Sequence, residues 1–109
     1  MTRTEERNLM YNSLQYSQTK VENGEKKYYD ARYNMWFTEE ETIKTFDILY
    51  EILDEMGYET AAELYLNGEV EDTANFAREL IERMYQNSLI SEEVYNASIS
   101  NMVIALAQA

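Results

Sequence analysis

Helix start signals, each followed by apolar residues at three- and four-residue spacing, constrain the fold of this chain most strongly. The clearest example is FTEEETIKTFDILYEILDEMG, residues 37–57. Here Thr38 and Glu41 have the spacing of a capping box, in which each side chain accepts a hydrogen bond from the other residue's backbone amide. Apolar residues then recur at helical spacing, and Gly57 can supply the left-handed stop. This pattern predicts one helix between Thr38 and Gly57.

Similar signals predict helices elsewhere in the chain. Thr4, Thr60, Thr73 and Ser91 are each placed to cap a helix. The residues predicted to face inward are Leu9, Met10, Leu14 and Tyr11 in the first helix, Ala61, Leu64 and Tyr65 in the short third, Phe76, Leu80, Ile81 and Met84 in the fourth, and Val94, Tyr95, Ile99, Met102, Val103 and Leu106 in the last.

The stretch 15–36 fits two structures. Asn23-Gly24 is a strong signal for a two-residue hairpin turn, and the residues after it alternate as in a strand. However, Tyr28, Ala31 and Met35 also have helical spacing, and Asn23-Gly24 then becomes a helix stop. In the hairpin, Lys20 lies opposite Lys27, which is mildly unfavourable. Both alternatives stay open at this point.

We therefore expect a mainly α-helical fold, a compact helix-rich single domain over residues 1–109. It has four to five helices and, in the first alternative, a small β-hairpin at about residues 16–33. A chain of 109 residues is long enough to bury a modest core without metal or disulfide support. No proline interrupts the predicted helices.

The composition excludes several classes of chemistry. The chain has no cysteine and no histidine, so it lacks cysteine nucleophiles, thiolate metal sites and the commonest general base. Its three glycines are too widely spaced for a phosphate-binding loop. Carboxylate runs such as NGEVED (67–72) lack the order of a calcium-binding loop. We expect no enzymatic activity, no cofactor and no metal site.

The chain also shows no membrane signal. No apolar run approaches the roughly 18 residues of a membrane span, and the N-terminus lacks the apolar core of a signal peptide. We expect a soluble, cytoplasmic protein.

Negative charge is concentrated in the second part of the chain. The formal net charge is −12, yet residues 1–33 hold five acids and six bases. Residues 39–72 hold twelve acids and one base, Lys44. Such a field repels nucleic acid and anionic membranes and attracts basic protein surfaces.

In the helix predicted for residues 37–57, most of the acids also lie on one face. At 100° per residue, five of the seven acids in residues 37–57 fall within about 100° of one another, opposite the apolar stripe. Further acids follow that helix. The candidate partner-binding acids are Glu40, Asp47, Glu51, Asp54, Glu55, Glu59, Glu63, Glu69, Glu71 and Asp72.

Tyrosines supply a second candidate contact. Ten tyrosines in 109 residues exceed what the predicted core can hold, and tyrosine is enriched at protein interfaces. We select Tyr28, Tyr29, Tyr33 and Tyr58 as candidate partner-binding aromatics. Together, acids and tyrosines suit a partner surface rich in arginine and lysine.

The runs TEEETIKTFDILYEILDEMGYETAAEL and NGEVEDTANF, in a short acidic chain without Cys, His or Pro, resemble the small phage-encoded inhibitors of host defence. These include anti-CRISPR proteins and DNA-mimic anti-restriction proteins. The resemblance is one of overall character. It implies a non-catalytic protein that binds a nuclease or effector complex and blocks its DNA-binding site, with the acids from Glu39 to Asp72 in place of phosphates. The near-neutral first third departs from DNA mimicry.

Two hypotheses follow. In the first, the chain is an acidic binding protein that inhibits a nucleic-acid-binding protein or nuclease complex of a host defence system, as a monomer or homodimer. In the second, it is a small self-associating helical adaptor or structural protein without nucleic-acid mimicry.

Overall fold

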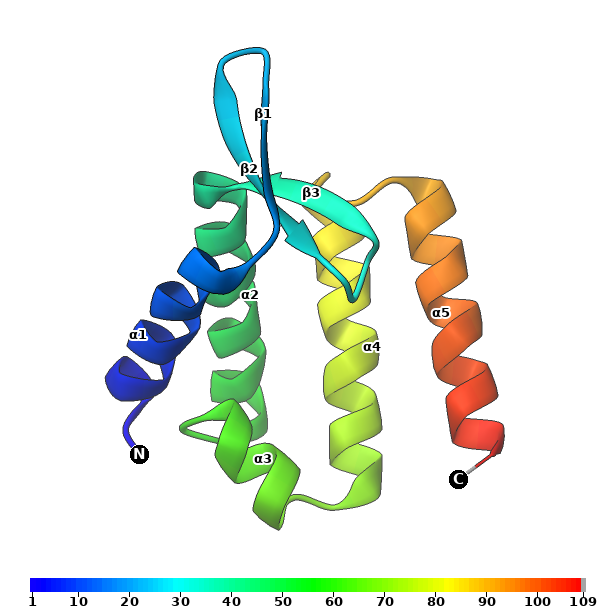
Figure 1. Ribbon diagram of the computed structural model, residues 1–109. Helices are drawn as coiled ribbons and strands as arrows, with labels where there is room; N and C mark the ends of the chain where they lie inside the picture. Colours follow the sequence, from blue (N-terminus) through cyan, green and yellow to red (C-terminus); the bar gives the residue numbers. More distant parts are fainter. Residues whose placement is uncertain (109) are drawn as a thin grey trace. The chain divides into compact units, whose positions relative to one another are not determined.

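The computed structural model describes residues 1–108, and over them the chain is mainly helical, with five α-helices, one short 3₁₀ helix and a three-stranded antiparallel sheet (Figure 1). The elements in chain order are α1 (Arg3–Ser13), η1 (Leu14–Tyr16), β1 (Thr19–Glu22), β2 (Glu25–Asp30), β3 (Met35–Thr38), α2 (Glu39–Met56), α3 (Ala61–Asn67), α4 (Val70–Gln86) and α5 (Glu92–Ala107). Contacts divide the chain into two compact units, Met1–Asp47 and Ile48–Ala109, with the boundary inside α2. The expected single domain stays a prediction.

The first unit begins with a helix that starts earlier than predicted. Thr2, rather than Thr4, is the cap: its hydroxyl accepts from the amide of Glu5, and the Glu5 carboxylate accepts from the amide of Thr2. The box S/T-x-x-E therefore lies two residues upstream of the expected cap. Leu9 and Tyr11 are exposed although the helical spacing placed them inward, and so is Tyr65 of the short helix α3.

The β-hairpin alternative for residues 15–36 is confirmed. Strands β1 and β2 pair antiparallel around a two-residue turn, and Asn23 and Gly24 both have positive φ, 53° and 80°. Positive φ at both positions is the requirement of a type I′ turn. Lys20 lies opposite Lys27, and the intervening Glu22 forms ion pairs with both, at 2.9 and 3.1 Å. The like-charge pair is thus compensated within the hairpin.

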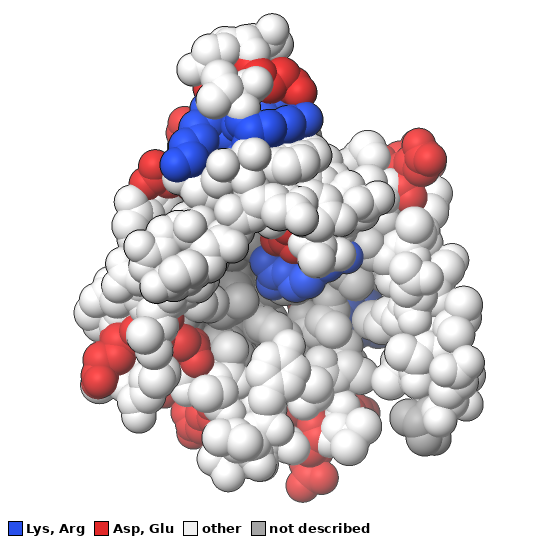
Figure 2. Space-filling model, viewed as in Figure 1, with Lys and Arg blue, Asp and Glu red and all other residues white. Residues whose placement is uncertain are grey.

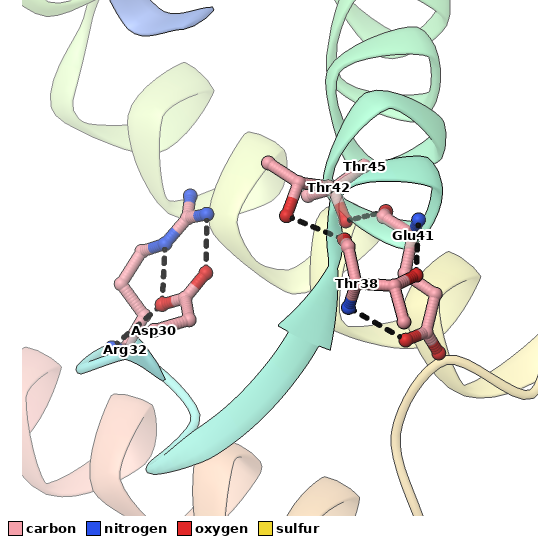
Figure 3. Close-up of polar contacts among 6 residues, drawn as sticks. All are labelled: Asp30, Arg32, Thr38, Glu41, Thr42 and Thr45. Atoms are coloured by element: carbon pink, nitrogen blue, oxygen red, sulfur yellow. Dashed lines mark hydrogen bonds and ion pairs between the residues drawn. The ribbon is translucent and has the colours of Figure 1, made fainter. Parts of the chain in front are cut away.

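A third strand was not predicted. Residues 31–34 form a turn, in which Asn34 has φ 51°, and β3 then pairs antiparallel with β2. The carboxylate of Asp30 accepts hydrogen bonds from the backbone amide and guanidinium of Arg32, which holds the start of this turn (Figure 3).

Strand β3 leads directly into α2 through the predicted capping box. The amide of Glu41 donates to the Thr38 hydroxyl at 3.1 Å, and the amide of Thr38 donates to the Glu41 carboxylate at 2.9 Å (Figure 3). The hydroxyls of Thr42 and Thr45 donate to carbonyls one turn earlier. Gly57, with φ 85°, ends the helix as predicted.

The second unit contains the remainder of α2 with α3, α4 and α5. Thr60 caps α3 as predicted, with its hydroxyl accepting from the amide of Glu63 at 3.0 Å. The predicted cap at Thr73 is wrong, because α4 begins at Val70 and its cap residue, Glu69, makes no side-chain capping bond. A cap without a side-chain bond leaves no sequence signature. The most deeply buried side chains of this unit are Ile52, Leu53, Leu64, Phe76 and Met84.

The last helix differs from its predicted burial. Ser91 caps α5 as expected, and its hydroxyl accepts from the amide of Val94. However, no residue of α5 is buried, and Val103 and Leu106, both predicted to face inward, are exposed. The helix contacts α4, where Tyr85 and Tyr95 stack with ring centroids 4.8 Å apart. Helical spacing identifies an apolar face but not what covers it.

Candidate functional site

Most of the net negative charge of the chain, −10 of −12, belongs to the second unit. That unit holds twelve acids and two bases, Arg78 and Arg83, whereas the first unit holds nine acids and seven bases. On the face drawn in Figure 2, basic side chains gather over the hairpin of the first unit, where Glu22 pairs with Lys20 and Lys27. The excess of acids over bases is therefore largest in the second unit.

The guanidinium of Arg83 forms ion pairs with three of the carboxylates. From α4 its guanidinium reaches Glu55 at 2.5 Å and Glu51 at 3.3 Å, both on α2, and Glu79 on its own helix at 3.3 Å. Burial by itself would lower the pKa of Arg83, but the hydrogen bonds and charges of Glu55 and Glu79 outweigh it and raise the pKa. Glu51 and Glu55 thus join α2 to α4 in addition to being exposed to solvent.

Local hydrogen bonds fix the acidic connection between α2 and α4. The Tyr58 hydroxyl donates to Asp72 at 3.0 Å, which raises the pKa of Tyr58, and the amide of Glu59 donates to the Glu63 carboxylate at 3.0 Å. Gly68 has an ordinary φ, but a Cβ there would lie 2.5 Å from the Leu64 carbonyl oxygen. These contacts fix the conformation of the connection. In it, Glu63 and Asp72 serve as hydrogen-bond acceptors for the Glu59 amide and the Tyr58 hydroxyl.

Glu69 and Glu71 differ from these acids. Both are exposed, and within residues 1–108 no hydrogen bond or ion pair engages either carboxylate. They lie in the stretch between Lys44 and Arg78, which contains no base. Of the other exposed candidates of this unit, Glu51 and Glu55 pair with Arg83, and Asp54 and Glu59 make further interactions of their own. Glu69 and Glu71 are thus the exposed candidate acids of the second unit whose carboxylates form no hydrogen bond or ion pair among the described residues.

The remaining two candidate acids lie in the first unit. Glu40 is exposed, and Asp47 is paired with Arg7 of α1 at 2.5 Å. A third acid of this helix, Glu39, accepts a hydrogen bond from the Tyr11 hydroxyl, which raises the pKa of Tyr11. Asp47 and Glu39 therefore attach α2 to α1.

Of the three candidate tyrosines in the first unit, Tyr33 offers the least surface. It is buried, 7% exposed, and packs edge-on against Phe37. Tyr29 is half-buried and lies against Trp36 with ring centroids 5.3 Å apart. Tyr33 therefore offers almost no surface to a partner, and Tyr29 offers part of one ring.

Tyr28, also half-buried, lines a cavity of about 230 Å³ in the first unit, together with Tyr11, Lys26 and Glu39. The Lys26 ammonium lies 5.4 Å from the centre of the Tyr28 ring, within the range of a cation–π contact. A cation of the chain itself therefore already lies over this ring.

Sequence reasoning missed the residues that organise the acids. Arg83 follows Glu79 by four positions, the spacing of a helical ion pair, so that contact was predictable from sequence. Its reach to Glu51 and Glu55, and that of Arg7 to Asp47, depend on tertiary packing.

Within residues 1–108, no group of three or more acidic side chains is placed to hold a metal ion. No described helix combines the length and apolar character that spanning a membrane requires. Comparison of the chain with protein-family models, curated proteins and solved structures finds no match.

Proposed function

We propose that this chain is a non-enzymatic acidic binding protein that inhibits a nucleic-acid-binding protein or a nuclease complex. In this proposal the carboxylates of the second unit take the place of DNA phosphates in the partner's basic binding site. The observation that carries the proposal is the excess of twelve acids over two bases in this unit, with Glu69 and Glu71 exposed and unengaged.

A DNA-binding channel is lined by arginine and lysine because each phosphate carries a negative charge, and neutralising phosphates supplies much of the affinity. An acidic protein surface offers the same sign of charge and the same hydrogen-bond acceptors. Charge density of this kind also raises the rate of encounter with a basic partner, and salt screens it.

Excess charge of one sign is otherwise unfavourable for the folded chain. Repulsion among like charges destabilises a compact unit, whereas interspersed lysines would give solubility without that repulsion. The segment between Lys44 and Arg78 contains nine acids and no base. This imbalance supports a functional role for the negative charge of the segment.

The test compares two matched pairs of substitutions in capture from host lysate. The test variant, Glu69→Gln/Glu71→Gln, removes two exposed acids at the start of α4. The control, Glu92→Gln/Glu93→Gln, removes two exposed acids from the first turn of α5. Both variants lose the same charge at a helix N-terminus, so both lose similar stability. Glu51 and Asp47 are avoided because their substitution also breaks ion pairs.

We expect wild type to capture a nucleic-acid-binding protein at low salt and to release it as salt rises. The α4 variant captures it at least several-fold less well, and the α5 control captures it as wild type does. Capture that is unchanged in the α4 variant, or that persists at high salt, would contradict the proposal.

A further inference from the structure

Helix α5 presents apolar side chains that no other described element of the second unit covers. Val103, Ile104 and Leu106 are 55%, 54% and 45% exposed, and none of the helix's residues, all of which are described, is buried. One side of the helix lies against α4 through Tyr95. The residues from Met102 to Ala107 are all apolar, so their turns are apolar on every side, including those away from α4.

The same helix is almost uncharged in a strongly charged chain. Glu92 and Glu93 in its first turn are its only charged residues, and none follows from Val94 to Ala107. In Figure 2, acidic atoms lie only at one end of α5, and the rest of its visible surface is uncharged. Its remaining polar positions are asparagines and serines.

We propose that the exposed face of α5, defined by Val103, Ile104 and Leu106, binds the same face of a second copy of this chain. Two copies that each carry −12 repel each other, and the repulsion is weakest where the approaching surfaces are uncharged. Interfaces between identical subunits are also more apolar than other interfaces. A basic partner gains no ion pair from this part of the helix.

A membrane surface fits less well. Helices that lie in the membrane interface are rich in lysine and arginine on their polar side, which attract anionic lipids. Helix α5 contains neither residue. The charge of the whole chain also opposes approach to anionic lipid.

Charge further selects the orientation of the two helices. A 16-residue helix is about 24 Å long. In an antiparallel pair centred on Val103–Leu106, each Glu92–Glu93 end lies about 18 Å from the centre at 1.5 Å per residue, so the two ends are about 36 Å apart. This is well beyond the screening distance of about 8 Å in physiological salt. A parallel pair would bring all four glutamates together. The geometry therefore favours an antiparallel pair with two-fold symmetry.

A contact built from one helix face is smaller than a standard interface of about 800 Å² per partner, so the dimer is weak and reversible.

The dimer is tested by sedimentation equilibrium on the full chain from about 10 μM to about 1 mM, where weak contacts become populated. The average mass rises from 12.9 kDa toward twice that value. Salt strengthens the association because it screens the repulsion. This response is opposite to that of the proposed inhibitory contact, so the two proposals can fail separately.

Three variants locate the contact. Val103→Glu/Ile104→Glu stays monomeric, and Val103→Ala/Ile104→Ala weakens the dimer without adding charge. Both positions are exposed in the monomer, so the fold survives, which circular dichroism checks. The control Leu66→Glu/Val70→Glu adds the same charge at two exposed apolar residues of the same unit. At high salt, where the added charge is screened, the control dimerises as wild type does.

The proposal is overturned if wild type is monomeric at about 1 mM in both low and high salt. It is equally overturned if the Leu66→Glu/Val70→Glu control loses association as completely as the α5 variant. Flotation of monomeric wild type with phosphatidylcholine vesicles, lost in Val103→Glu/Ile104→Glu, would assign the face to lipid instead and also overturn it.

Discussion

Arg83 supplies the counter-charge for three of the acids in the second unit. Its side chain is only 21% exposed and contacts Glu51, Glu55 and Glu79, which are more exposed. An isolated surface ion pair contributes little, but a network around one partly buried guanidinium contributes more. Removing Arg83 leaves three neighbouring carboxylates without a shared counter-charge.

We predict that Arg83→Met lowers the free energy of unfolding by about 1–2 kcal/mol, since it breaks several charge-assisted hydrogen bonds while keeping the apolar stem. Urea unfolding measures the change. The control is Arg78→Gln, which removes the same charge from an exposed position of the same helix and changes stability by less than about 0.5 kcal/mol. Equal losses in the two variants would show that total charge, and not the Arg83 network, sets stability.

At the scale of elements, the ion pairs of Glu22 with Lys20 and Lys27 contribute to the stability of the hairpin of β1 and β2. Hydrogen bonds and charges from Lys20 and then Lys27 lower the pKa of Glu22 below its ordinary value of 4.5. A carboxylate whose pKa is lowered by folding stabilises the fold above its unfolded-state pKa. That contribution is lost as pH falls through the folded-state pKa.

We predict that the hairpin loosens as pH is lowered below about 4.5, and that Glu22→Gln removes this part of the pH dependence. Backbone chemical shifts of β1 and β2 between pH 6 and pH 3 report the change. Glu25→Gln is the control, because Glu25 lies opposite Glu22 in the same hairpin but makes no ion pair among the described residues. Identical titration curves for wild type and Glu22→Gln would refute the prediction.

Much of the element order was predictable because local hydrogen bonds define it. The capping boxes and caps at Thr38, Thr60 and Ser91, and the Asn23-Gly24 turn, involve residues within four positions of one another. Strand β3 was missed because the alternating pattern continues through the turn at 31–34, and only Asn34 there is a common turn residue.

The candidate site was predictable in sign but not in arrangement. The count of acids gives the charge of a segment, and helical geometry gives the face of one helix. Which acids are engaged by Arg7, Tyr58 or Arg83 depends on contacts between residues 14 to 40 positions apart. The exposure of α5 was missed for the same reason. The spacing of its apolar residues was recognised from the sequence, but whether another element covers them depends on tertiary packing.

At the scale of the whole molecule, a net charge of −12 makes stability depend on salt. The second unit holds twelve acids and only two bases, so its carboxylates repel one another, and salt screens that repulsion. We predict that the melting temperature rises by several degrees between about 20 mM and about 500 mM NaCl. Scanning calorimetry measures it. Glu69→Gln/Glu71→Gln shows a smaller rise, and a melting temperature that falls with salt would mean that the ion pairs outweigh the repulsion.

The central claim, that the acidic second unit occupies a DNA-binding site, is tested most directly by competition. The captured partner is purified and its binding to labelled duplex DNA is measured while this protein is added, at two salt concentrations. We expect that the protein displaces DNA competitively, that Glu69→Gln/Glu71→Gln displaces it several-fold less well, and that higher salt weakens displacement. A ternary complex of partner, DNA and this protein, with DNA affinity unchanged, would contradict the account.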